Sequence, residues 1–193
     1  MAAWRRGLRA YFVWLVAHAL AGAAFAPLAP PLFGFDARTI IAEGLYAGTV
    51  FGVAQWLALR PFLANAWVWV PVTIIVSPLA WSFGIFVGVY TVAIGGWLGA
   101  GVSATAQAGV LLWSLRRNQL MFGLLWVAAA VIGGAVFYVF FLVALSSGSH
   151  PPAYELIIAG AIGYGVVTGL VVALVAVLEA GRSARVSVDA ESK

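Results

Sequence analysis

The chain has 193 residues, of which 64% are hydrophobic and only 8% are charged. A soluble domain carries about 25% charged residues, so this composition excludes a soluble globular protein, which would lack the polar side chains to cover its surface. The sequence contains no cysteine, which excludes disulfides, thiolate metal sites and thiol redox chemistry.

Long uncharged runs predict membrane-spanning helices. Between Arg60 and Arg116 the chain has no acidic residue, no basic residue and no histidine. As one helix this run would measure about 80 Å, against a hydrocarbon core of about 30 Å, so it must hold two spans. The runs are continuous and do not alternate between apolar and polar residues, which excludes the strands of a membrane β-barrel.

Applied to the whole chain, the same reasoning predicts an all-α fold, a polytopic transmembrane helical bundle. Its six spans are residues 8–28, 40–59, 67–87, 95–115, 120–145 and 155–178. A basic N-terminal segment, residues 1–7, precedes this transmembrane domain, residues 8–178. A polar cytoplasmic tail, residues 179–193, follows it and has the composition of a disordered segment.

The basic residues predict the orientation of the bundle. If the N-terminus is cytoplasmic, every basic residue except Arg38 lies on the cytoplasmic side, as the positive-inside rule requires. We therefore expect both termini in the cytoplasm, and the composition, rich in arginine, alanine and glycine, suggests a bacterial inner membrane. The basic residues lie at span ends and form no continuous patch, so we expect no nucleic-acid partner.

The N-terminus has one other interpretation. Its basic start, its apolar stretch and the small residues Ala24 and Ala26 also fit a cleaved secretory signal. The apolar sequence continues through Phe35, however, and His18 interrupts it. We therefore prefer an uncleaved first span.

The sequence repeats itself after about 57 residues, which is the length of a helical hairpin. Residues 52–60 align with residues 109–117, and Trp56 then falls on Trp113. Each copy returns the chain to the same side, so the repeats are parallel. The expected hairpins are residues 8–59, 67–115 and 120–178, of which the third is degenerate.

The second helix of each hairpin carries a small residue at every fourth position. Such stripes let helix backbones approach closely in a membrane, so we expect the three second helices to pack through them at the bundle centre. A substrate groove lined by exposed backbone is the alternative. The stripes are Gly44, Gly48 and Gly52; Gly101, Thr105 and Gly109; and Ala161, Gly165 and Gly169.

The first stripe leads into a motif made of Gly52, Gln55, Trp56, Leu57, Leu59 and Arg60, and Trp67 and Trp69 then open the next helix. This pattern resembles uncharacterised glycine-rich multi-pass bacterial membrane proteins built from repeated hairpins. The second copy departs from it, with Leu112 in place of the glutamine and Ser114 in place of a leucine. The resemblance covers the first four spans and implies an architecture, but no activity.

Tryptophans lie beside the arginines at several span ends. Trp56, Trp67, Trp69 and Trp113 all have this position. Indole rings favour the membrane–water interface, so we expect these four side chains in an aromatic belt. An aromatic ligand cage is the less favoured alternative.

Polar residues inside the spans form one candidate site. His18 and Gln107 each lie about ten residues from a cytoplasmic span end, so both should reach a depth of about 15 Å. Ser103 lies one turn from Gln107 on the same helix face. Intramembrane polar residues usually face the bundle interior and often mark a pathway. The cluster could bind a solute or relay protons; alternatively, its groups satisfy one another and only hold helices together.

Glu43, Glu155 and His150 are expected near the outer surface. There they could form a shallow mouth that attracts cations or binds a metal. They lie on separate loops and helix starts, however, and acidic residues also suit helix N-termini on electrostatic grounds alone. We therefore expect no metal site and no cofactor.

The sequence carries no catalytic motif of the common hydrolase, metalloprotease or phosphate-binding types. We therefore favour a non-enzymatic structural or partner-binding bundle in the lipid bilayer, which associates with itself or with another membrane protein. The alternative is a small-molecule transporter, or the substrate-binding membrane subunit of one. That alternative predicts an internal cavity and sensitivity to substitution at His18, Ser103 or Gln107.

Overall fold

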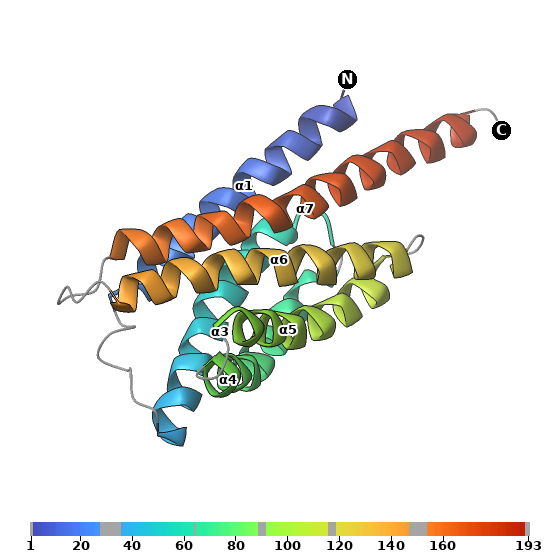
Figure 1. The fold of residues 1–193 in the computed structure, drawn as a ribbon. Coiled ribbons are helices and arrows are strands. Elements are labelled where there is room, and N and C mark those ends of the chain that lie inside the picture. Colours follow the sequence, from blue (N-terminus) through green and yellow to red (C-terminus); the bar gives the residue numbers. More distant parts are fainter. Residues whose placement is uncertain are drawn as a thin grey trace.

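Six long α-helices and one short 3₁₀ turn build the described part of the chain, which contains no strand (Figure 1). This confirms the predicted all-α fold class. The computed structural model describes residues 2–27, 36–63, 65–88, 92–115, 119–146 and 154–191. The elements are α1 (Ala2–Phe25), α3 (Ala37–Leu59), η1 (Ala66–Val68), α4 (Trp69–Gly88), α5 (Val92–Ser114), α6 (Gln119–Ser146) and α7 (Tyr154–Glu191).

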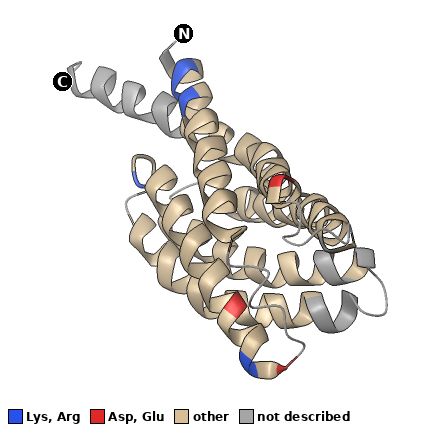
Figure 2. Cartoon of the chain, turned by 90° about the vertical axis from the view of Figure 1, so that its left-hand side faces the viewer, with Lys and Arg blue, Asp and Glu red and all other residues tan. Residues whose placement is uncertain are grey.

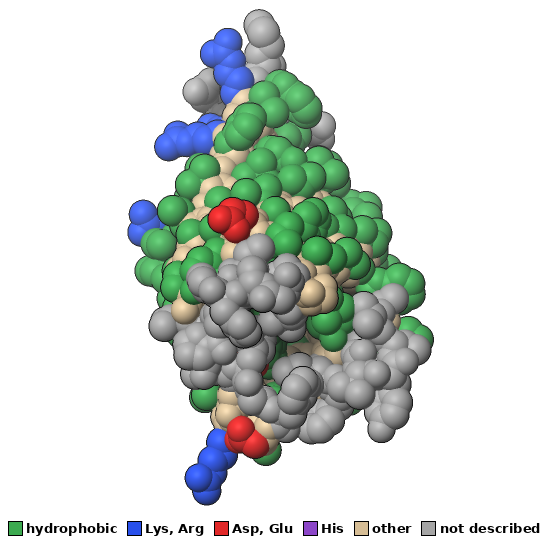
Figure 3. Space-filling view, turned by 60° about the vertical axis from the view of Figure 1, so that its left-hand side comes forward, with side chains coloured by type: hydrophobic (Ala, Val, Ile, Leu, Met, Phe, Trp, Pro, Cys, Tyr) green, Lys and Arg blue, Asp and Glu red, His purple; other side chains and the backbone are tan. Residues whose placement is uncertain are grey.

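Within the described residues, five helices are long and apolar enough to cross a membrane: α1, α3, α4, α6 and α7. The helix α5 lies where the fourth span was predicted, but its glycine, serine, threonine and glutamine residues lower its hydropathy, and it is not among the five. Exposed apolar side chains cover most of the face shown in Figure 3. These features indicate a membrane-embedded protein.

At both ends of the chain, the terminal helix is longer than the span that the sequence predicts. The helix α1 already begins at Ala2, inside the basic N-terminal segment. The helix α7 continues to Glu191, through most of residues 179–193, so the expectation of a disordered tail is wrong. The physical reason is that extending an existing helix avoids the cost of nucleating a new one.

The side chain of Asp36 caps the start of α3. Its Oδ1 accepts hydrogen bonds from the backbone N–H groups of Arg38 and Thr39, at 3.0 and 3.1 Å. The Thr39 hydroxyl also donates to the carboxylate. These bonds favour the ionised form, and Thr39 makes the largest contribution, so the pKa of Asp36 lies below its ordinary value. The cap determines where the first turn of α3 begins.

The helices form a closed ring in chain order, because each packs against the next and α7 packs against α1. Figure 1 shows α1 and α7 side by side, so the start of α1 and the end of α7 lie toward the same end of the bundle. The second helices of the expected hairpins, α3, α5 and α7, therefore each lie between two first helices. The expectation that these three meet at the bundle centre is wrong, because short connections place consecutive helices next to one another.

The glycine stripe of α3 packs against α4 instead. A Cβ atom added at Gly44 would lie 2.8 Å from the backbone nitrogen of Pro78, and one added at Gly48 would lie 2.9 Å from the Cα of Ile74. Both distances are shorter than a Cβ contact allows, and the neighbouring atoms belong to the backbone of α4. The two backbones are therefore in direct contact, as the stripe predicted, but with a different partner helix.

The stripe of α7 packs against α1. A Cβ atom added at Gly165 would lie 3.0 Å from the Cβ of His18, and one added at Gly169 would lie 3.1 Å from the indole of Trp14. Ala161 faces Gly22. The last stripe thus brings α7 close to the two polar side chains that α1 buries.

The stripe of α5 does not pack as expected. Gly101 faces α6, where an added Cβ would make an ordinary contact of 3.7 Å with Val131. Thr105 and Gly109 are exposed, and a Cβ added at Gly109 would meet no described atom within 4 Å. The expected packing role of Thr105 and Gly109 is therefore wrong in this bundle. The helix buries its opposite side, with Ala104, Gln107 and Leu111.

Two hydrophobic clusters fill the interior, one toward each end of the helical bundle. The cluster nearer the N-terminus contains Trp14, Trp69 and Trp126, and the other contains Phe25 and Phe141. The side chain of Trp69 is fully buried, so its expected place in a surface aromatic belt is wrong. Its indole N–H has a partner inside the bundle, which holds the ring in the core.

We predict that Gly44→Ala destabilises the bundle by about 1–3 kcal/mol, because the added methyl group collides with the backbone of α4 and forces two helices apart. Thermal unfolding in mild detergent measures this as a fall in Tm of several degrees.

The matched control is Gly109→Ala, where the added methyl group meets open space. It should leave Tm unchanged or raise it, because alanine favours a helix over glycine by about 1 kcal/mol. Equal losses in the two variants would contradict the direct contact between α3 and α4.

Candidate functional site

Three polar side chains from three helices meet in the core: His18 of α1, Gln55 of α3 and Gln107 of α5. All three are buried, with at most 3% of each side chain exposed. The amide nitrogen of Gln55 lies 3.3 Å from Nε2 of His18, and Gln107 Nε2 donates to the Gln55 oxygen at 3.2 Å. Gln55 therefore links the other two.

Two tryptophans determine the orientation of the two amides. Trp69 Nε1 donates to Gln55 Oε1 at 2.7 Å, and Trp126 Nε1 donates to Gln107 Oε1 at 3.2 Å. An indole N–H can only donate, so the atom that faces it must be the amide oxygen. Gln107 Nε2 then also donates to the hydroxyl oxygen of Thr73, at 3.1 Å. We call His18, Gln55, Gln107, Thr73, Trp69 and Trp126 the amide network.

The orientation of Gln55 in turn assigns the tautomer of His18. The amide nitrogen of Gln55 is a donor, so His18 Nε2 must accept and carries no proton. The other ring nitrogen, Nδ1, lies 3.0 Å from the carbonyl oxygen of Trp14 and must donate to it. His18 is therefore a neutral imidazole with both nitrogens bonded, which suits a fully buried side chain.

A second set of contacts supports this network from α1 and α7. Trp14 Nε1 donates to Thr168 Oγ1 at 2.9 Å, and the Thr168 hydroxyl donates to the Tyr164 carbonyl at 2.8 Å. The ring of Trp126 stands edge-on to both Trp14 and Trp69, with centroids 5.6 and 5.2 Å apart. Edge-to-face packing of this kind stabilises aromatic pairs beyond their burial.

The structure brings together two of the three residues of the predicted site, His18 and Gln107, and puts Ser103 beside them. His18 and Gln107 belong to the same network, but Gln55 connects them. Ser103 lines a cavity beside this network. The alternative, in which the polar groups of the cluster only bond one another, fits His18, because both of its ring nitrogens have hydrogen-bond partners within the bundle.

The predicted site does not include Gln55, although this residue belongs to the motif at the end of the second span. Counted from Arg60, Gln55 lies only five residues from its helix end, whereas Gln107 lies about ten residues from Arg117. A depth count therefore puts the two amides at different levels. The hydrogen bond from Gln107 Nε2 to Gln55 Oε1 nevertheless joins the two amides, so the distance of a residue from its helix end does not give its level in this bundle.

A cavity of about 170 Å³ lies beside the amide network, enclosed by α3, α4, α5, α6 and α7 and partly open. Gln55, Thr73 and Gln107 form its polar end. One N–H of Gln55, the hydroxyl hydrogen of Thr73 and one lone pair of the Gln107 oxygen remain after the bonds described above. The polar end can therefore offer two donors and one acceptor to a bound molecule.

Aromatic and small side chains together form the walls of the cavity. Cavities of about 150 Å³ in protein cores hold a benzene molecule, so this one has room for a molecule of about that size. Small residues, among them Ala47, Ala100 and Ser103, keep the space open. The aromatic side chains that line it are Phe51, Trp81, Phe137, Tyr138, Phe141 and Tyr164.

Glu43 lies near the opposite end of the cavity from the amide network. Although it is only two turns from the start of α3, its side chain is 1% exposed. Trp81 Nε1 donates to its Oε2 at 2.6 Å. Its Oε1 is buried and has no hydrogen-bond partner among the described residues, a condition that only Ser114 Oγ shares there.

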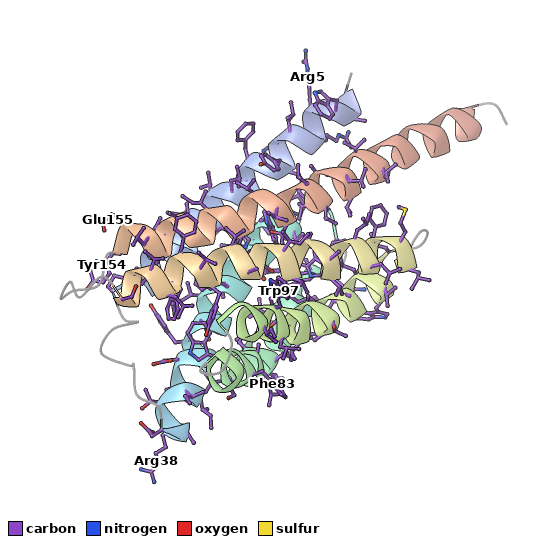
Figure 4. The ribbon with its side chains drawn as sticks, in the orientation of Figure 1. Arg5, Arg38, Phe83, Trp97, Tyr154 and Glu155 are labelled. Atoms are coloured by element: carbon purple, nitrogen blue, oxygen red, sulfur yellow. The ribbon has the colours of Figure 1, made fainter. Side chains whose placement is uncertain are left out.

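The expected mouth of Glu43, Glu155 and His150 is not assembled in the described part of the chain. Glu155 is exposed at the start of α7, where Figure 4 labels it, whereas Glu43 is buried against Trp81. His150 lies outside the described residues. Within them, no group of three acidic or histidine side chains is arranged to hold a metal ion.

Comparisons with protein-family models, with curated proteins and with solved structures find no match for this chain. The function must therefore be inferred from the site itself.

We predict that Thr73→Val destabilises the bundle by about 1 kcal/mol, because it removes the acceptor of one Gln107 N–H and leaves that donor buried. Valine keeps the branched shape that packs against Gly52. Chemical or thermal unfolding in detergent measures the loss.

Thr105→Val on the exposed face of α5 is the control, since the Thr105 hydroxyl bonds only the Gly101 carbonyl of its own helix. It should change stability by less than half as much. If both variants unfold alike, the amide network contributes no stability of its own.

Proposed function

We propose that this chain is a multi-pass membrane protein that binds a small molecule inside its helical bundle, either as a carrier or as the substrate-binding membrane subunit of a transporter. The observation that carries this proposal is the cavity of about 170 Å³ between five helices, with amides at one end and aromatic walls. Ligand sites are typically apolar clefts with a few placed polar groups.

The chemistry of the cavity favours binding over catalysis. The groups at its polar end are two neutral amides and a threonine hydroxyl, and most of their hydrogen-bonding positions are already used within the bundle. None of these groups is a nucleophile with a neighbouring base. The proposal therefore includes no catalytic step.

The proposal includes an orientation with both termini in the cytoplasm of a bacterial cell. Arg5 and Arg38 lie at opposite ends of the molecule (Figure 4). Figure 2 shows the described Lys and Arg positions near the ends of helices and not along their middles. The positive-inside rule then puts the Arg5 end, which has more basic residues in the sequence, on the cytoplasmic side.

One observation favours a second candidate, the structural or partner-binding role. The exposed face of α5 carries Thr105 and Gly109, with Trp113 one turn further along, 61% exposed. Small residues on a lipid-facing helix allow another membrane helix to pack closely. This face would suit self-association or another membrane protein.

We predict that a small molecule co-purifies with the full-length protein in mild detergent and that Ser103→Phe reduces its recovery at least ten-fold. The phenyl ring would fill the cavity that Ser103 lines. Thr105→Phe is the matched control, because it places the same ring two residues away on the exposed face. Mass spectrometry of the eluates, for small molecules and for proteins, measures both outcomes.

Recovery of the same molecule from wild type and Ser103→Phe in equal amounts would contradict binding in the cavity. A stoichiometric protein partner without any small molecule, lost in Thr105→Phe, would support the second candidate instead. The two variants therefore separate the two functions.

A further inference from the structure

The carboxylate of Glu43 is in an unusual environment for a charged group. Its side chain is 99% buried, and in the described part of the chain its hydrogen bond comes from the neutral indole of Trp81. Arg38, the basic residue nearest to it along α3, is exposed and lies at the far tip of the helix (Figure 4). A buried carboxylate without a cationic partner is strongly unfavourable.

Glu43 lies directly behind the wall of the cavity. The indole of Trp81, which donates to its Oε2, lines the cavity, and so does Ala47, one turn further along the same face of α3. The unpartnered Oε1 is on the same carboxylate. The side chain of Trp81 therefore lies between the cavity and the Glu43 carboxylate, whose Oε1 has no hydrogen-bond partner among the described residues.

The walls beside Glu43 are suited to a positive charge. Trp81 and Phe141 line this part of the cavity, and their rings meet edge to face with centroids 5.6 Å apart. Aromatic faces attract organic cations, most strongly where water is excluded. The same faces would accept the apolar body of such a molecule.

From these observations we infer that the ligand is a small organic cation, an ammonium group on an apolar body, for which Glu43 supplies the counter-ion. The inference rests on the proposed function, because it requires a molecule in the cavity. A neutral ligand could donate a hydrogen bond to Glu43 Oε1 but would leave the negative charge of the carboxylate uncompensated, and an anionic ligand would be repelled by that charge. The ammonium group would lie at the Glu43 end, with the apolar body along the aromatic walls toward Gln55 and Gln107.

The test compares two probes of nearly the same shape that differ in charge, benzylammonium and benzyl alcohol. Their binding to the full-length protein in lipid nanodiscs is measured by equilibrium dialysis, and binding to Ser103→Phe nanodiscs is subtracted as the contribution of the lipid. We expect the wild type to bind benzylammonium at least ten-fold more tightly than benzyl alcohol. Glu43→Gln should bring the two affinities within about three-fold of one another.

Two further variants make the comparison decisive. Glu43→Met has neither charge nor buried donors, so it reports the same loss if the glutamine variant folds poorly. Glu155→Gln removes an exposed carboxylate from the start of α7 and should keep the full preference for benzylammonium.

Equal binding of the two probes to the wild type would overturn the inference and leave the proposed function standing. A preference that survives in both Glu43 variants, or that disappears in Glu155→Gln, would also overturn the role of Glu43. If neither probe binds the wild type above the Ser103→Phe background, the inference fails; absence of a co-purifying molecule in the separate purification would remove the proposed function as well.

Discussion

Four helices meet at the amide of Gln55, whose oxygen accepts from Trp69 and Gln107 and whose nitrogen donates to His18. Inside a membrane no water is present to satisfy a polar group that loses its partner. Each of these bonds therefore constrains where the neighbouring helix can lie. The same constraint explains why buried tryptophans accompany the amides: an indole adds apolar bulk together with one N–H that matches an amide oxygen.

The close contact between α3 and α4 and the cavity beside α3 are related features of the bundle. The backbone contact of Gly44 and Gly48 with α4 brings Trp81 within reach of Glu43. Further along the same helix, Phe51 lines the cavity. A larger residue in the stripe would move α4 and would thereby disturb the polar contacts at both ends of the cavity.

The helices were predictable from sequence because each is a long apolar run that ends near charged or turn-forming residues. The burial of His18 and Gln107 was predictable as well, since polar groups avoid lipid. Their connection through Gln55 was not, because it depends on helix tilt and rotation, which residue spacing does not encode. Trp69 was misplaced for a related reason: its position near a span end fits an interface, but its N–H has a buried partner that only the fold reveals. Glu43 likewise lies near a helix start, and only the contact between α3 and α4 encloses it.

The cavity is the feature that supports the proposed binding role over a role in helix packing alone. An enclosed, unfilled cavity in a protein core costs about 24 cal/mol per Å³, so this partly open cavity of about 170 Å³ would cost less than about 4 kcal/mol when unfilled. Small residues along its wall, Ala47, Ala100 and Ser103, leave that space where single larger side chains would fill it. A bundle that only holds its helices together gains nothing from such a space, or from a buried carboxylate whose Oε1 has no hydrogen-bond partner among the described residues. A cation that fills the space would lie close enough to the Glu43 carboxylate to compensate its charge, and it would thereby offset both costs at once.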